Sequence, residues 1–396
     1  MNKNFSKIKN PLCILPKYLY GTKKYGLSPE YNALYLPLKK NFKNLTFIDS
    51  LKNKNLEKFN KQIINYCEKH KPDYIFFSIF HYEIYLETLA YLKNNLKIFL
   101  INWSSDDSWR FDQHSKILSR FFDCMITNSI SAKFFYSQNR INYILSSWGC
   151  PDNWYKKVNK SKSFAYDILF VGKSYFDRKK IISKLKKKYR VTCYGSDWGT
   201  RSLKDHEMSK IFRKAKVSLN FSKSRGDLKQ VKARVFEIAG SGGFCLTESS
   251  NELKNFFNGS EIDSFNSFSE LISKIDLYLK NHKLRAAMSS RANIKVKKQY
   301  LYSKIVNKII LKILKMKKNN NACKEPSLKR KEIYLILLCI GRGYKFLLAN
   351  FLNIFMQKEK AWKITRRLMF ELEWRFRGEL VYSKYGLCNK LYDVYY

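Results

Sequence analysis

The sequence lacks the features that define several protein classes. It has 32 Asp and Glu against 76 Lys and Arg, so acids are scarce and carboxylate-rich metal clusters are not expected. The nine cysteines form no Cys-x-x-Cys pair and no metal-ligand spacing with histidine, which is typical of reduced, structural thiols in a cytoplasm. The apolar run Pro11–Pro16 is too short for the core of a signal peptide. We therefore expect a cytoplasmic protein without a metal site.

Long apolar runs are also missing. A polar, basic linker, Lys315–Lys331, leads to two apolar segments, Ile333–Ile340 and Phe346–Met356, which are separated by the glycine-containing and basic stretch Gly341–Lys345. Neither segment approaches the 18 apolar residues of a membrane-spanning helix, so we expect none. Two alternatives stay open for this tail. It lies in the membrane interface with its basic side chains toward anionic headgroups, or it packs against the rest of the protein.

Positive charge is abundant. The formal net charge of +44 attracts phosphate, anionic lipid or nucleic acid. The basic residues are spread along the chain rather than clustered, and no recognisable nucleic-acid-binding module accompanies them. We therefore expect no nucleic acid partner, and we expect an anionic membrane surface to be a secondary partner at most.

The 396 residues are too many for one ordinary core. Strand-like apolar runs alternate with amphipathic helical stretches as far as about Leu314, which predicts an α/β fold with parallel, doubly wound sheets. The pattern restarts near Gly149–Pro151. We predict a Rossmann-like acceptor domain at 1–150, a Rossmann-like nucleotide-binding domain at 151–316, and a basic linker with a helical extension at 317–396. The expected strands are Leu12–Leu15, Leu45–Phe47, Tyr74–Phe80, Lys97–Asn102, Cys124–Thr127 and Tyr143–Ser146, then Asp167–Val171, Val191–Tyr194, Val217–Phe221 and Gly243–Thr247.

The segment Val231–Phe244 carries the strongest signal for a ligand. It predicts a helix, Gln230–Ala239, whose amino end offers free amides and a positive dipole to an anion such as a diphosphate. Glycines allow the backbone to approach a ligand closely. In the alternative interpretation, Glu237 simply forms an ion pair with Arg234 on the helix surface. The candidate donor-binding residues here are Lys232, Arg234, Glu237, Gly242 and Gly243.

Turns at other strand ends carry weaker signals. Gly172 and Lys173 follow the strand Asp167–Val171, and Arg178 begins the next helix, so these basic groups are placed to neutralise phosphate. Gly195 follows the strand Val191–Tyr194 in the same way. Because the carboxyl ends of parallel strands share one edge of the sheet, these turns are expected to meet at one site.

The first domain has its own candidate site. The strand Lys97–Asn102 runs into Asp106 and Asp107, which are candidate catalytic carboxylates that bind or activate an acceptor hydroxyl. Three further residues, Trp103, Trp109 and His81, are candidates for acceptor binding. The alternative is an aspartate helix cap beside two core tryptophans.

Residues 71–315 resemble a known family, the glycosyltransferases of the GT-B fold related to spore-maturation-protein-like and group 1 enzymes. The most specific motif is an Arg-x-Phe-Glu run that ends in a glycine pair, and in this chain the pair is displaced by one position. The motifs that carry the resemblance are Lys71-Pro72-Asp73, Asp106-Asp107, Phe170-Val171-Gly172 with Arg178, and Arg234-Val235-Phe236-Glu237-Ile238-Ala239-Gly240-Ser241-Gly242-Gly243.

The resemblance implies a hexosyltransferase-like enzyme that moves a sugar from a nucleotide-diphosphate donor to a glycan, lipid-linked or protein acceptor. Glu237 would bind the ribose, basic residues the diphosphate, and neither a metal nor another cofactor would be needed. Such enzymes build cell-surface polysaccharides in the cytoplasm, some of them at the inner face of the membrane. Lys229 replaces a second glutamate found in related retaining enzymes, so retention and inversion both stay open. The alternative function is a catalytically inactive GT-B scaffold or regulator at the membrane surface.

Overall fold

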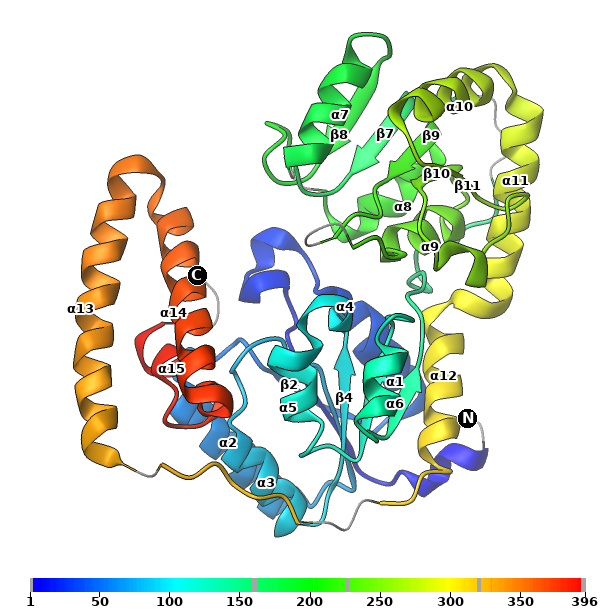
Figure 1. The fold of residues 1–396 in the computed structure, drawn as a ribbon. Coiled ribbons are helices and arrows are strands. Elements are labelled where there is room, and N and C mark those ends of the chain that lie inside the picture. The colour runs from blue at the N-terminus through cyan, green and yellow to red at the C-terminus, as the bar shows by residue number, and fades with distance from the viewer. Residues whose placement is uncertain are drawn as a thin grey trace.

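The protein is represented by a computed structural model that describes residues 3–158, 163–174, 176–201, 203–224, 228–318, 322–328 and 330–392. Two α/β domains lie one above the other, and a helical hairpin stands beside the first of them (Figure 1). Both sheets are entirely parallel, as the alternating pattern predicted. The expected class, two doubly wound domains of the GT-B type with a helical extension, is thereby confirmed.

The first domain contains a six-stranded sheet in the order β2-β1-β3-β4-β5-β6. Strands β1, β4 and β5 are buried along their whole length, because helices cover both faces of a parallel sheet. The strands are β1 Pro11–Leu15, β2 Thr46–Asp49, β3 Tyr74–Phe77, β4 Phe99–Ser104, β5 Cys124–Thr127 and β6 Tyr143–Leu145. The helices are α1 Leu36–Asn41, α2 Leu56–His70, α3 Leu86–Asn94, α4 Asp107–Arg110, α5 Lys116–Leu118 and α6 Lys133–Gln138.

Helix α2 shows how the local sequence sets these elements. The side chain of Asn55 accepts a hydrogen bond from the backbone N–H of Lys58 and caps the helix, and Lys71 ends it in the left-handed conformation. The apolar positions at helical spacing, Leu56, Phe59 and Ile63 among them, are buried against the sheet.

The second domain contains a five-stranded sheet in the order β11-β10-β9-β7-β8. In chain order, its first four strands and the helix predicted at Gln230–Ala239 lie within a few residues of the predicted positions, whereas the short strand β11 was missed. The strands are β7 Tyr166–Val171, β8 Val191–Tyr194, β9 Ala215–Asn220, β10 Cys245–Glu248 and β11 Asp263–Phe265. The helices are α7 Phe176–Lys186, α8 Asp205–Arg213, α9 Ala233–Gly240, α10 Phe268–Lys280 and α11 His282–Lys295.

Helix α12, Tyr302–Ile313, returns to the first domain. Its apolar face, which includes Ile305, Ile309 and Ile313, packs in one cluster with Leu34 of the first domain. Sequence analysis had assigned residues up to 316 to the second domain. The helix instead completes the core of the first, because the chain crosses between the domains again after α11.

The tail forms a hairpin of two long helices, α13 Lys331–Phe355 and α14 Lys358–Arg377, followed by α15 Leu387–Leu391. The expectation of two separate apolar segments was wrong, because α13 continues through Gly341 and Gly343. At Gly341 a side chain would lie 2.7 Å from Leu391, so glycine permits this close helix packing. By length and composition, helix α13 is long and apolar enough to cross a membrane. Only 6% of its most apolar 18-residue stretch is buried within the protein.

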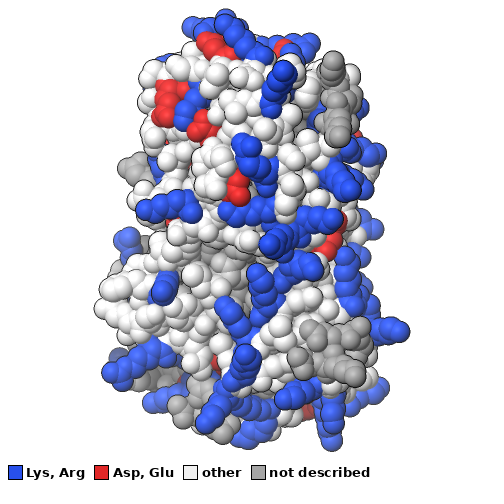
Figure 2. Space-filling model, turned by 90° about the vertical axis from the view of Figure 1, so that its right-hand side faces the viewer, with Lys and Arg blue, Asp and Glu red and all other residues white. Residues whose placement is uncertain are grey.

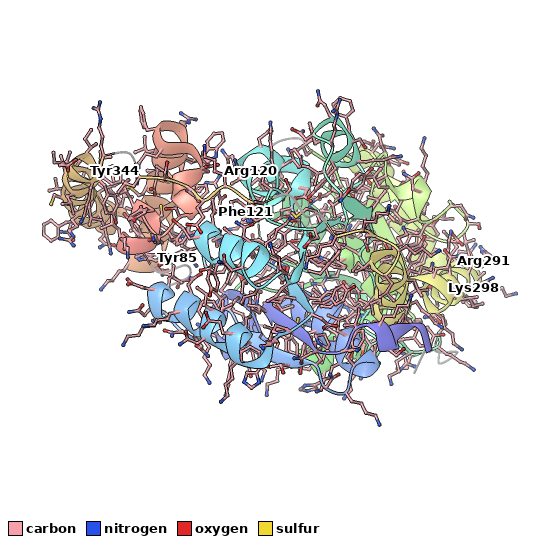
Figure 3. The ribbon with its side chains drawn as sticks, turned by 90° about the horizontal axis from the view of Figure 1, so that it is seen from below. Tyr85, Arg120, Phe121, Arg291, Lys298 and Tyr344 are labelled. Carbon is pink, nitrogen blue, oxygen red and sulfur yellow. The ribbon has the colours of Figure 1, made fainter. Side chains whose placement is uncertain are left out.

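The hairpin stands beside the first domain, whereas the second domain lies above it (Figure 1). Seen from below, Tyr344 of α13 is at one end of the molecule, and Arg291 and Lys298 are at the other (Figure 3). On the face opposite the hairpin, lysines and arginines are spread over both domains, with few acids between them (Figure 2). The positive charge is therefore dispersed rather than gathered in one patch on this face.

Candidate functional site

The centre of the second sheet brings several predicted residues together. Strand order reverses at β7, where β8 lies on one side and β9 on the other, and such switch points bind ligands at the carboxyl ends of the strands. Gly172 and Lys173 follow β7 at this edge. The guanidinium of Arg178 donates to the carbonyl of Lys173 at 3.3 Å and to that of Lys223, after β9, at 3.4 Å. Arg178 thus links the two loops at the switch point.

Glycine is required where the loops after β7 and β8 meet. Gly195 has a φ of +125°, and a Cβ there would lie 2.4 Å from the carbonyl oxygen of Gly172. The N–H of Gly172 donates to the carbonyl of Tyr194 at 2.9 Å, and the indole N–H of Trp198 donates to the carbonyl of Gly172 at 2.8 Å. Gly172 and Gly195 therefore approach each other closely and hold the two loops together.

The amino end of α9 faces this edge. Lys232 is its N-cap, and its side chain does not cap the N–H groups of Ala233 and Arg234, which point toward an anion at this end. The N–H of Val235, by contrast, donates to the carbonyl of Lys232 at 3.1 Å. Burial lowers the pKa of Lys232 to about 8, and the nearby Asp106 opposes this shift while Arg178 adds to it. Lys232 therefore lies between Arg178 of its own domain and a carboxylate of the first domain.

The two domains touch at the same place. The hydroxyl of Ser108, in the short helix α4 after β4, donates to the side-chain oxygen of Gln230 at 2.8 Å. The backbone N–H of Ser131 donates to the carboxylate of Glu252 at 3.1 Å. The amino end of α9 thus meets the carboxyl edge of the first sheet.

Two acids were not among the predicted site residues: Glu248, which ends β10, and Glu252, which follows it. One oxygen of Glu248 accepts from the backbone N–H groups of Ser222 and Lys223 at 2.9 and 3.0 Å, and the other pairs with Lys229 at 3.1 Å. Lys229 stands where the related retaining enzymes have an acid, and the carboxylate of Glu248 lies beside it. The signal was an acid directly after a predicted strand.

Glu30 is a third residue that sequence analysis missed. It lies in the first domain before the π-helical turn Tyr31–Tyr35, and it is 8% exposed. Burial raises its pKa to about 7, and the charges of Asp106 and Glu83 act in the same direction. A carboxylate of this kind is poised to exchange a proton near neutral pH. No motif marks Glu30, because the segment that carries it is irregular.

Comparison with known proteins agrees with this geometry. Residues 178–310 match the family model described as glycosyl transferase-like. The second domain is therefore similar to glycosyl transferase-like domains. This match covers α7 through most of α12, and it includes Arg178, Lys232 and Glu237. No curated protein sequence matches the chain significantly.

Solved structures share the whole two-domain fold. The Anabaena protein HepE in complex with UDP-glucose aligns with a TM-score of 0.57 at 12% identity, over 76% of this chain and 99% of HepE. Sucrose-phosphate synthase from Thermosynechococcus elongatus aligns with a TM-score of 0.52 at 12% identity, over 77% and 98%. A glycosyltransferase from Rickettsia africae gives 0.52 at 11% identity, over 78% and 98%. At these identities the likeness establishes the GT-B fold.

The two candidate catalytic carboxylates, Asp106 and Asp107, have different surroundings in this GT-B structure. Asp106 is half-buried and acts electrostatically on Lys232 across the domain junction. Asp107 is 2% exposed, and it accepts hydrogen bonds from the hydroxyls of Ser115 and of Tyr136, the latter at 2.8 Å. Asp107 therefore faces the interior of the first domain, where it holds the loop that carries Asp106.

The candidate acceptor residues are also separated. Trp103 is 1% exposed and belongs to the core of the first domain, so it does not wall a ligand site. Trp109 is half-buried, with the guanidinium of Arg110 5.6 Å from its ring centroid. His81 lies beside α14 of the hairpin, and burial, with the charges of Arg366 and Arg110, lowers its pKa well below the usual value.

The candidate donor residues of α9 lie at opposite ends of the helix. Gly242 and Gly243 follow its carboxyl end, about 12 Å from Lys232 at 1.5 Å per residue. A Cβ on Gly242 would lie 3.1 Å from the backbone of Lys156, and one on Gly243 would lie 2.7 Å from that of Phe212. The prediction that these glycines approach the diphosphate is corrected. They allow α9 to pack against the interdomain segment and α8.

Glu237 has the ion pair that the alternative interpretation described. Its carboxylate lies 2.5 Å from the guanidinium of Arg234, and its side chain is 14% exposed. Burial raises its pKa, Arg234 opposes that shift, and Asp205 adds to it. Within the described ranges, no group of three or more His, Cys, Asp or Glu side chains is placed to hold a metal ion.

Proposed function

We propose that this protein transfers a sugar from a nucleotide-diphosphate donor, with a UDP-sugar as the leading candidate, to an acceptor hydroxyl held by the first domain. The observation that carries the proposal is the convergence of Arg178, Lys232 and the amino end of α9 at the switch point of a glycosyltransferase-like domain. HepE, which shares the fold, was solved with UDP-glucose, and this supports UDP as the nucleotide.

The second domain stabilises the leaving group in this proposal. When the bond between the sugar and the diphosphate breaks, negative charge grows on the diphosphate, and preorganised positive groups lower the barrier most at that point. Arg178, Lys232 and the first amides of α9 supply those groups without a metal ion. Glu237, held by Arg234, accepts hydrogen bonds from the ribose hydroxyls with its second carboxylate oxygen.

The first domain activates the acceptor. The acceptor oxygen bonds to the anomeric carbon as the diphosphate departs, and its proton passes to a carboxylate. Glu30 is the base that fits this step, because its pKa of about 7 leaves it partly ionised at neutral pH. Asp106 lies beside both Glu30 and Lys232, and it orients the acceptor between them.

The hairpin supports a location at the inner face of the membrane and a lipid-linked or cell-surface glycan acceptor. Its large apolar side chains are exposed to a degree that is unusual for a soluble surface. Basic residues such as Arg342, Lys358 and Lys360 are exposed on the same two helices and complement anionic headgroups. The exposed apolar residues are Ile333, Leu335, Ile336, Ile340, Phe346, Leu347, Phe351, Ile354 and Phe355 of α13, and Ile364, Leu368, Leu372 and Phe376 of α14.

A panel of nucleotide sugars tests the donor proposal. We expect at least one of them to raise the melting temperature of the full-length protein, because a ligand that binds only the folded state stabilises it by mass action. The same compound should be hydrolysed or transferred slowly by the purified protein. If no nucleotide sugar binds, the enzyme proposal fails. Binding without any turnover would instead favour the inactive GT-B scaffold.

Vesicle sedimentation tests the membrane proposal. Phe346 of α13 and Phe134 of α6 have nearly equal exposure, 67% and 66%, so they form a matched pair. We expect Phe346→Asp to reduce binding to vesicles that contain phosphatidylglycerol, whereas Phe134→Asp leaves it unchanged. If the two variants bind these vesicles equally, the hairpin does not attach the protein to the membrane.

A further inference from the structure

A small recess lies between the first domain and the hairpin. His81, Arg110 and Gln113 line it from the first domain, and Arg366, Arg367 and Tyr382 line it from the hairpin side. His81 follows β3, and Arg110 ends the short helix α4 after β4, so the recess is at the carboxyl edge of the first sheet. That edge is where an acceptor is expected to bind in this fold.

Positive charge in the recess is incompletely matched. Arg110 is 8% exposed, and one of its N–H groups donates to the carbonyl of Phe80 at 2.6 Å. Neither Arg110 nor Arg366 has an ion-pair partner among the residues that the structure describes, and the Nε of Arg366 is buried without a hydrogen bond. Burying a guanidinium without a counter-ion is costly, so an anion from outside would stabilise this arrangement.

The neighbouring acids are engaged elsewhere. Both oxygens of Glu83 accept backbone N–H groups, from Phe80 at 2.6 Å and from His81 at 2.7 Å. Glu371 pairs with Arg367 and also accepts from Gln113 at 3.1 Å. Three guanidinium groups thus face two carboxylates that already have partners. The excess charge rests mainly on Arg110 and Arg366.

The size of the recess restricts its ligand. Its volume of about 20 Å³ admits little more than a water-sized group, which excludes a sugar ring and lets an anionic group enter by a terminal oxygen. Planar guanidinium groups match the oxygens of phosphate especially well. Phe370 of α14 also lines the recess, and the exposed apolar side chains of Ile364 and Leu368 lie on the same helix, which favours a phosphate attached to a lipid.

From these contacts we infer that the hairpin completes an acceptor subsite, in which Arg110, Arg366 and Arg367 bind a phosphoryl group of the acceptor. The inference rests on the proposed function, because it assigns the anchor of the acceptor that the enzyme glycosylates. It also explains why α14 presents two adjacent arginines, Arg366 and Arg367, to the first domain. The C-terminal extension is then part of the binding site as well as a membrane contact.

Calorimetric titration of the full-length protein with inorganic phosphate tests the subsite. Arg366→Gln removes one charge inside the recess, and Arg375→Gln removes one from an exposed position on the same helix, so the pair controls for net charge. We expect Arg366→Gln to weaken phosphate binding about tenfold or more, whereas Arg375→Gln retains it. Phosphate binding should also persist in Lys232→Gln, which alters only the donor end. Circular dichroism melts establish that each variant is folded.

The outcomes separate the subsite from the donor proposal. Equal phosphate affinity of Arg366→Gln and Arg375→Gln, or no saturable binding by the wild type, would overturn the inference when vesicle binding is also independent of Arg366. Binding of the nucleotide-sugar panel is measured on the same proteins. Absence of binding by every member would defeat the donor proposal while leaving the phosphate result intact.

Vesicles that contain phosphatidic acid or phosphatidylglycerol identify the source of the phosphate. Arg366-dependent binding to phosphatidic acid alone indicates a lipid phosphate monoester. Arg366-dependent binding of free phosphate without a lipid preference indicates a soluble phosphorylated acceptor. Either result supports the subsite. Loss of the Arg366 dependence in both assays contradicts it.

Discussion

Lys232 offers the sharpest test of the donor site. Its ammonium is half-buried at the amino end of α9, between Asp106 and Arg178. Replacement by Gln removes a charge-assisted hydrogen bond to the diphosphate while keeping a side chain of similar length. Such bonds contribute about 1.5–3 kcal/mol, so we expect the Kd for the donor to rise roughly 10- to 150-fold. Lys280→Gln, at an exposed position on α10, is the matched control and should bind normally.

The pH dependence makes this test specific. Burial lowers the pKa of Lys232 from 10.5 to about 8, so the charged form that binds phosphate is lost as pH rises through that value. Calorimetry with UDP-glucose, whose diphosphate charge is constant in this range, should show affinity falling above pH 8 by about tenfold per unit. Lys232→Gln should abolish this alkaline decline. The same decline in the variant, or unchanged affinity at pH 7, would refute the assignment.

Three further predictions concern the base, the loop glycines and the hairpin. Because the pKa of Glu30 is raised to about 7, kcat/KM should increase with pH through that value as the carboxylate ionises. Glu30→Gln should remove this rise and lower turnover about 100-fold or more. If the pH–rate profile of the variant still rises near pH 7, Glu30 is not the base. Gly195→Ala should cost about 3 kcal/mol or more in urea unfolding, since its Cβ would meet a carbonyl at 2.4 Å. Gly199→Ala, with a φ of +73° in open space, should cost only about 1–2 kcal/mol. Leu347→Asp, at a site 70% exposed, should release the protein from anionic vesicles without lowering its melting temperature, and an unchanged vesicle-bound fraction would argue against the hairpin contact.

Much of the fold could be predicted because its strands are buried on both faces. Continuous apolar runs such as Cys124–Thr127 and residues 168–171 stand out against polar turns, and their alternation with helices requires parallel pairing. Strand β11 has three residues, Asp263–Phe265, and is too short and polar to give this signal. Helix α13 was misread because two glycines and two basic residues suggested a break, whereas packing of Gly341 against Leu391 tolerates them.

The site was predicted less completely than the fold. Sequence position indicated that Arg178 and Lys232 lie at strand and helix ends, and topology brings those ends together. It could not indicate which way adjacent side chains point, so Asp106 and Asp107 looked equivalent until burial separated them. Glu30 and the arginine recess depend on contacts between segments far apart in the chain, which no local pattern records.

A crystal structure of the protein with UDP bound would test the central claim most directly. The account predicts that the diphosphate lies at the carboxyl edge of the second sheet, with its oxygens within hydrogen-bond distance of Lys232, Arg178 and the first amides of α9. The ribose should lie against Glu237. UDP bound at another surface, or a diphosphate placed at the Gly242–Gly243 end of α9, would contradict it.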